Sequence, residues 1–150
     1  MDANLPTHGE GYDISVTFAL GQTWAPTQGY YTIWNYGEAA NKKANGLHIY
    51  YGGGLNQINH SWHGGGGNEL RYLSTNGTQF FDAFRSDTTI RVVYDGTTRY
   101  MAVNGAVVAS DTPGSHEVVK NDNFTLGYLN DSAGNPMQLF KGTIKDLKVS

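Results

Sequence analysis

The sequence has no cysteine among its 150 residues, only 4 prolines, and no long apolar run. The missing thiols exclude a disulfide framework, a cysteine-based zinc site and thiol catalysis. No run of about 18 apolar residues occurs, so nothing predicts insertion into a membrane. Lys and Arg number 10 against 13 Asp and Glu, a net charge of −3. The sequence therefore lacks the basic surface that nucleic acid or anionic lipid attracts.

The first four residues, Met1 to Asn4, are polar and acidic rather than basic and apolar, so the sequence predicts no secretory signal peptide at this end. A native Met1 predicts a cytoplasmic protein, whereas an excised domain carrying an added methionine predicts an extracellular or cell-surface location. The length fits one domain over residues 1–150, long enough to bury a core without covalent staples.

Glutamate is scarce, with four residues, while glycine (20) and tyrosine (10) are abundant and accompanied by many Asn and Thr. Helix surfaces favour Glu, Lys, Ala and Leu, whereas Gly, Asn and Thr belong to strands and turns. The composition therefore predicts an all-β protein. Aromatic residues make up 13% of the chain, more than a small core needs, so we expect some rings at the surface, where they suit sugars.

Short apolar–polar alternations separated by turn residues predict ten to twelve strands and a β-sandwich or jelly roll. Residues 37–46 are expected to form a helical or loop-like insert, and Gly52 to Gly54 a break between strands. Asp95-Gly96 and Asn104-Gly105 predict tight hairpin turns. The predicted strands are 13–20, 30–36, 47–51, 56–62, 69–73, 88–94, 99–103, 106–109, 124–129 and 140–149.

The second half of the chain contains four motifs in order: residues 92–96 and 100–108, the strand 124–127 and the final strand 140–147. They resemble, respectively, the paired hairpins, the strand that follows them and the closing strand of laminin-G-like and pentraxin-like domains. The resemblance covers roughly 60 residues in order. It implies a concanavalin A-like jelly roll of two antiparallel sheets, a fold shared by sugar binders, adhesion modules, calcium-dependent recognition domains and accessory modules of secreted enzymes.

The densest group of functional side chains lies around the four glycines Gly64 to Gly67. An indole face stacks on sugar rings, and amide and carboxylate groups bind hydroxyls. In a strand, His60 and Trp62 share a face and His63 lies on the other. Trp34 and Tyr36 extend this platform if their face is the exposed one; the alternative is that these rings fill the core. The predicted ligand-binding residues are His60, Trp62, His63, Asn68, Glu69, Arg71, Trp34 and Tyr36.

Calcium is the metal that the resemblance implies, in edge loops that offer carboxylates and carbonyls. The Asn- and Asp-rich segments 121–123 and 130–135 are the candidate loops, and Asp122, Asn130 and Asp131 the candidate ligands. The alternative is that these residues only form turns. Zinc is disfavoured, because His60 and His63 point to opposite faces of a strand.

The sequence predicts a non-catalytic protein. Glycosidases need two carboxylates about 5–10 Å apart, and the four glutamates are scattered, with no second carboxylate near Glu69 in sequence. The leading hypothesis is a carbohydrate-binding domain of the lectin or adhesin type, with glycans as partners. A protein-interaction module without a sugar site, and an accessory glycan-binding module of an enzyme, are the alternatives. Because single sugar sites bind with Kd values of roughly 1 mM, we also expect homo-oligomers or tandem copies.

Overall fold

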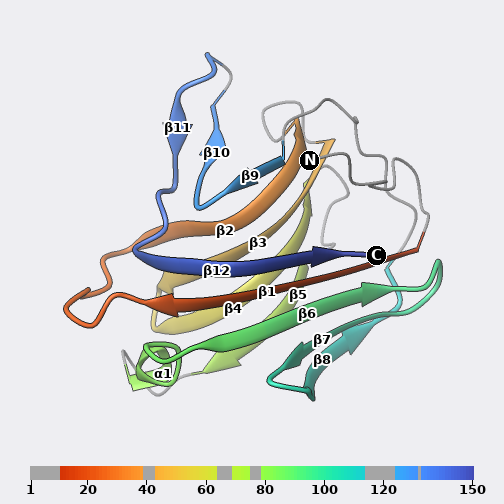
Figure 1. The fold of residues 1–150 in the computed structure, drawn as a ribbon, viewed down its shortest axis with the longest axis horizontal. Coiled ribbons are helices and arrows are strands. Elements are labelled where there is room, and N and C mark those ends of the chain that lie inside the picture. Colours follow the sequence, from red (N-terminus) through yellow and green to blue (C-terminus); the bar gives the residue numbers. More distant parts are fainter. Residues whose placement is uncertain (1–10, 39–42, 64–68, 75–78, 114–123, 132) are drawn as a thin grey trace.

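The computed structural model describes residues 11–38, 43–63, 69–74, 79–113, 124–131 and 133–150. Within them the chain forms two antiparallel five-stranded sheets, packed face to face, and a short two-stranded hairpin (Figure 1). We call the sheet with strand order β12-β1-β6-β7-β8 the first sheet and the sheet with order β5-β4-β3-β2-β9 the second sheet. The predicted all-β, two-sheet antiparallel sandwich is confirmed.

The first sheet consists of β12 (Gly142–Val149), β1 (Tyr12–Leu20), β6 (Thr88–Tyr94), β7 (Arg99–Val103) and β8 (Ala106–Asp111). The second sheet consists of β5 (Glu69–Ser74), β4 (Leu55–His63), β3 (Lys43–Gly52), β2 (Gly29–Glu38) and β9 (Phe124–Leu126). The hairpin pairs β10 (Leu129–Asn130) with β11 (Pro136–Met137), and one helical turn, α1 (Gln79–Asp82), precedes β6. Among the residues that the structure describes, no helix is long and apolar enough to cross a bilayer.

The core between the sheets follows from strict alternation in β1. Every second residue, from Tyr12 to Leu20, is buried, and the intervening side chains point away from the second sheet. Period-two alternation places successive side chains on opposite faces of a strand. Ile90 and Val92 of β6 and Ile49 and Ile58 of the second sheet complete this contact, all fully buried.

A β-bulge in β2 changes which residues reach the core. Thr32 pairs with His48, but Trp34 pairs with the very next residue, Leu47, so Ile33 is the extra residue. A bulge places two successive side chains on one face. Ile33 and Trp34 are accordingly both fully buried in the core.

The bulge also decides which faces the residues after Ile33 occupy. Asn35 lies on the outer face of the second sheet, where its Oδ1 is next to Gly46. Trp34 and Tyr36 are 0% and 2% exposed, respectively. Their face is the core face, so the expectation that these two rings extend an exposed platform is wrong.

Turn chemistry was predicted correctly where the two residues of a turn were diagnostic. Asn104 and Gly105 both have positive φ angles, 48° and 86°, and connect β7 to β8. Elsewhere the boundaries differ from expectation. Most of the predicted insert at 37–46 belongs to strands β2 and β3, with residues 39–42 outside the described part. The single strand expected over 124–129 is divided at Gly127, whose φ is 82°.

Candidate functional site

The outer face of the second sheet carries mostly uncharged polar and aromatic side chains, arranged in rows across neighbouring strands, and one ion pair on β5. Paired residues on adjacent strands lie roughly 5 Å apart, so three rows form a continuous patch, which we call the polar face. Alternation and the register define its members. They are Tyr30, Tyr50, Gln57 and Leu73 in the first row, Thr32, His48, Asn59 and Arg71 in the second, and Asn35, Gly46, Ser61 and Glu69 in the third.

A pair of tyrosines lies at one end of the polar face. The Tyr30 and Tyr50 rings have centroids 4.5 Å apart and planes inclined at 42°, and the His48 ring lies edge-on, 6.3 Å from Tyr30. Tyr30 is 42% exposed. An exposed phenol supported by a second ring offers both an apolar surface and a hydroxyl to a ligand.

His48 is held by hydrogen bonds that fix its tautomer. The Thr32 hydroxyl donates to Gln138 Oε1 at 3.0 Å, so its oxygen accepts from His48 Nδ1 at 3.1 Å. Gln138 follows β11 and has a φ of 54°, unusual for a residue other than glycine. The main-chain carbonyl oxygen of Gln138 also accepts a hydrogen bond from the Thr32 main-chain amide at 2.8 Å. The chain after the β10–β11 hairpin thus positions His48 on the polar face.

Gly46 gives His48 its space. A Cβ atom at Gly46 would lie 2.6 Å from His48 Nε2 and 2.8 Å from Asn35 Oδ1. These separations are shorter than any ordinary contact, so the His48 and Asn35 side chains can occupy the space above residue 46 only because it is glycine.

Within the described part of the chain, three amide atoms of the polar face are buried without a hydrogen-bond partner: Asn35 Oδ1, Gln57 Oε1 and Asn59 Nδ2. The three residues are at most 5% exposed. The other end of one amide is occupied, because Ser61 Oγ donates to Asn59 Oδ1 at 2.7 Å. Buried polar atoms nearly always have partners, so three unsatisfied atoms on one face mark it as a place where water or a ligand can form hydrogen bonds.

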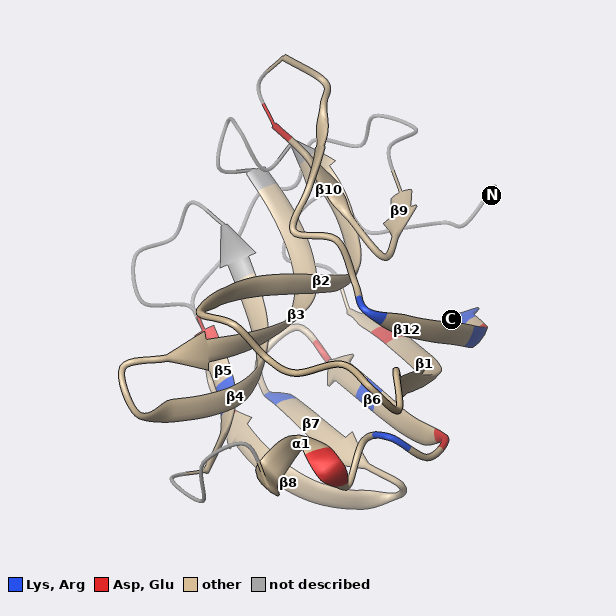
Figure 2. Ribbon diagram, turned by 90° about the vertical axis from the view of Figure 1, so that its left-hand side faces the viewer, with Lys and Arg blue, Asp and Glu red and all other residues tan. Residues whose placement is uncertain are grey.

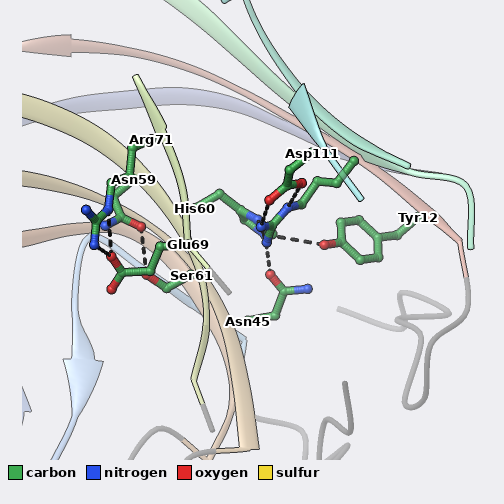
Figure 3. A network of polar contacts seen from close by, with 9 residues as sticks. Tyr12, Asn45, Asn59, His60, Ser61, Glu69, Arg71 and Asp111 are labelled. Carbon is green, nitrogen blue, oxygen red and sulfur yellow. Dashed lines mark hydrogen bonds and ion pairs between the residues drawn. The ribbon is translucent and has the colours of Figure 1, made fainter. Parts of the chain in front are cut away.

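Glu69 and Arg71 form an ion pair at the opposite end of the rows, on β5 (Figure 3). Arg71 Nε donates to Glu69 Oε2 at 2.8 Å, and Arg71 Nη2 contacts the same oxygen. The pair acts on Tyr30 from across the sheet. Partial burial chiefly raises the pKa of Tyr30, the negative charge of Glu69 raises it further, and Arg71 opposes this. Side chains of β2 and β5 therefore face a common region.

His60, by contrast, does not lie on the polar face. It is fully buried between the sheets. Figure 3 shows it beside Tyr12, Asn45 and Asp111, apart from the Glu69–Arg71 pair. Since a guanidinium has only donors, Arg99 Nη1 donates to His60 Nδ1 at 3.2 Å, and Nε2 donates to Asn45 Oδ1 at 2.5 Å. The Tyr12 hydroxyl lies 3.4 Å from Nε2. The expectation that His60 faces a ligand is wrong, because its strand face is the core face.

Of the other predicted ligand residues, Glu69 and Arg71 lie on the polar face and are partly exposed. Trp62 and His63 belong to β4, but their side chains fall outside the described part, as does Asn68. Their roles stay predictions. Asn35, His48, Gln57 and Asn59 were missed. The available signal was a series of uncharged polar residues at alternate positions of adjacent strands.

Asp131, one of the predicted calcium ligands, has a structural role in a turn. Asp131 Oδ1 accepts the amides of Ala133 at 2.9 Å and Asn135 at 2.8 Å, which closes the turn between β10 and β11. Asn130 ends β10, and Asp122 lies outside the described residues. Among the residues that are described, no three His, Asp or Glu side chains gather as metal ligands. Calcium binding stays a prediction.

In comparisons with known proteins, the chain matches solved structures but no family model or curated sequence. Mouse laminin α1 domains LG4-5 are similar over 94% of this chain and 35% of theirs, with a TM-score of 0.60 and 15% identity. The CBM40 of the Ruminococcus gnavus IT-sialidase, bound to α2,3-sialyllactose, is similar over 93% of this chain and 75% of its own, with a TM-score of 0.66 and 15% identity. The fold is a concanavalin A-like jelly roll.

A third jelly-roll match is found in a phage protein. Tailspike protein 2 of the Escherichia coli O157:H7 bacteriophage CAB120 aligns over 94% of this chain, with a TM-score of 0.61 and 10% identity. This chain spans about a third of the laminin structure and a fifth of the tailspike. The same jelly roll therefore occurs within much longer proteins.

Proposed function

We propose that this jelly roll is a non-catalytic carbohydrate-binding domain and that the polar face of the second sheet is its ligand surface. Sugars present C–H faces that stack on aromatic rings, together with hydroxyls that bind amides and charged side chains. The polar face combines both kinds of group, with the Tyr30–Tyr50 pair beside rows of amides, an imidazole and the Glu69–Arg71 pair.

The observation that carries the proposal is the set of unpartnered amide atoms on Asn35, Gln57 and Asn59. Each unsatisfied buried polar atom costs on the order of 1–3 kcal/mol. A protein that needed this face only for packing would be more stable with apolar or satisfied residues there. Hydroxyl groups both donate and accept, so a sugar can satisfy the acceptor atoms of Asn35 and Gln57 as well as the donor of Asn59.

The non-catalytic part of the proposal depends on the carboxylates. Glu69 is the carboxylate of the polar face among the described residues, and its Oε2 is occupied by Arg71. Glycoside hydrolysis requires a second carboxylate across the scissile bond. Among the similar structures, the CBM40 supports glycan binding, because it was solved with a glycan bound.

The test is a glycan array followed by calorimetry, with the wild type beside Tyr30→Ala. The matched control is Tyr100→Ala, which removes a half-buried tyrosine from the outer face of the first sheet. Loss of one stacking ring is expected to weaken binding about fivefold to tenfold, and the control variant should bind like the wild type. A folded wild type that binds no glycan refutes the proposal, and equal binding by Tyr30→Ala refutes the location.

Two further arms test the remaining site predictions in the same assay. Trp62→Ala tests the loop beside the four glycines, and binding lost in that variant extends the site beyond the polar face. Repeating the titrations with calcium and with EDTA tests the metal. Binding that is unchanged by EDTA contradicts a calcium-assisted site.

A further inference from the structure

Charged residues are nearly absent from the strands that form the polar face. Residues 29–37, 44–52 and 55–63, which make up almost all of β2, β3 and β4, contain no Asp, Glu, Lys or Arg. Figure 2 shows these strands as long tan stretches, in contrast to β6, β7 and β12 of the first sheet. On the described part of the polar face, the charge therefore comes from β5 alone.

The single cation there is already neutralised. Arg71 directs both its Nε and its Nη2 at Glu69 Oε2. Charge-assisted contacts from two nitrogens of one guanidinium fix its orientation as well as its energy. A ligand carboxylate or sulfate approaching Arg71 therefore meets the negative charge of Glu69 at the same point.

The direction of the unpartnered hydrogen-bonding groups leads to the same conclusion. Two of the three, Asn35 Oδ1 and Gln57 Oε1, are acceptors. A hydroxyl can donate to them, whereas a carboxylate or sulfate carries acceptors only and leaves them unsatisfied. The polar face is thus matched to hydroxyls in its hydrogen bonding and neutral in its charge.

From these two observations we infer that the polar face selects neutral glycans over anionic ones, and that Glu69 sets this preference by neutralising Arg71. The inference rests on the proposed carbohydrate-binding function and names the ligand class of that same site. It also separates this chain from the similar CBM40, whose bound ligand, sialyllactose, carries a carboxylate.

The experiment compares matched glycan pairs in which a neutral oligosaccharide is printed beside the same oligosaccharide bearing a sialic acid, a uronic acid or a sulfate. Wild type and Glu69→Gln are screened, and Kd values are measured for the best pair at 50 and 500 mM salt. The amide at position 69 retains an oxygen acceptor for Arg71 but leaves its positive charge uncompensated. The control is Asp13→Asn, because the Asp13–Arg91 pair on the first sheet has almost the same exposure, 32% and 50% against 31% and 49%.

The wild type is expected to bind the neutral member of each pair at least as well as the anionic member. Glu69→Gln should shift the ratio of the two affinities toward the anionic member by about fivefold, the factor that two unit charges about 4 Å apart supply in water. This gain should fall at high salt, and Asp13→Asn should leave the ratio unchanged.

Two results overturn the inference while leaving the proposed function intact: a wild type that prefers the anionic members, or an affinity ratio that Glu69→Gln does not change. A folded wild type that binds no glycan in either class is a different result. It refutes the carbohydrate-binding function itself, and the selectivity falls with it.

Discussion

Replacing Arg99 by methionine is expected to destabilise the sandwich more than any surface substitution. The Arg99 side chain is fully buried. Its Nε and Nη2 donate to Asp111 at 2.9 and 2.5 Å, and its Nη1 donates to His60, which belongs to the opposite sheet. Methionine fills much of the volume but offers none of these donors, so the Asp111 carboxylate loses its ion-pair partner and His60 Nδ1 loses the hydrogen bond from Arg99.

The size of the effect follows from how much water reaches the abandoned groups. Removing one member of a buried ion pair costs roughly 3–5 kcal/mol. The Asp111 side chain is 33% exposed, so water can solvate its carboxylate after the change, and the lower end, about 3 kcal/mol, is expected. For a domain of this size that corresponds to a melting temperature lowered by about 6–12 °C.

The assay is urea unfolding followed by tryptophan fluorescence, together with thermal unfolding by circular dichroism, both at neutral pH. Arg91→Met is the matched control, because Arg91 pairs with Asp13 on the outer surface, where 50% of its side chain is exposed. Exposed pairs contribute about 0–1 kcal/mol. If Arg99→Met unfolds within 1 kcal/mol of Arg91→Met, the buried network does not stabilise the fold as argued.

Two further predictions concern the polar face and a hairpin. Gly46→Ala should destabilise the protein by about 1–3 kcal/mol and weaken glycan binding, because its Cβ would displace His48 and Asn35; Gly53→Ala is the comparison, since nothing lies within 4 Å of a Cβ there, although its φ of 60° carries some backbone strain of its own. Equal glycan affinities for the two variants would contradict this. In the β6–β7 turn, the amides of Thr98 and Thr97 donate to Asp95 Oδ1 and lower the pKa of its carboxyl below the ordinary 3.8. Its charged form therefore stabilises the fold above pH 4, and this contribution is lost as the pH falls through the lowered pKa. Denaturant titrations should therefore show that the stability advantage of the wild type over Asp95→Asn decreases only as the pH falls through that acid range. A stability difference that does not depend on pH would contradict this role of Asp95.

The fold was largely predictable because its signals are local. The alternation that buries Tyr12 to Leu20 and the positive φ angles at Asn104 and Gly105 are properties of neighbouring residues. Local patterns also predicted the number and order of the main strands. Strand ends were less accurate where tertiary pairing extends a strand through residues of weak propensity, as at the ends of β2 and β3.

The candidate site was predictable only in part. Glu69 and Arg71 were identified from their chemistry, and the structure places both on the polar face. His48 and Asn59 were not, although they are register partners in one row with Arg71. A row across strands joins residues far apart in the sequence, so no single segment displays it.

The sequence by itself determined the all-β class, the turns and the uncharged character of the central strands, because composition and short-range alternation are enough for these. Only the tertiary structure decided which face each aromatic and histidine occupies. One extra residue, Ile33, puts Trp34 and Tyr36 into the core and Asn35 outside. His60 likewise lies on the core face of β4, where it accepts a hydrogen bond from Arg99, a residue 39 positions away on the opposite sheet. Such pairings depend on strand register and on long-range contacts between the two sheets, and a period of two along a single strand carries no information about either.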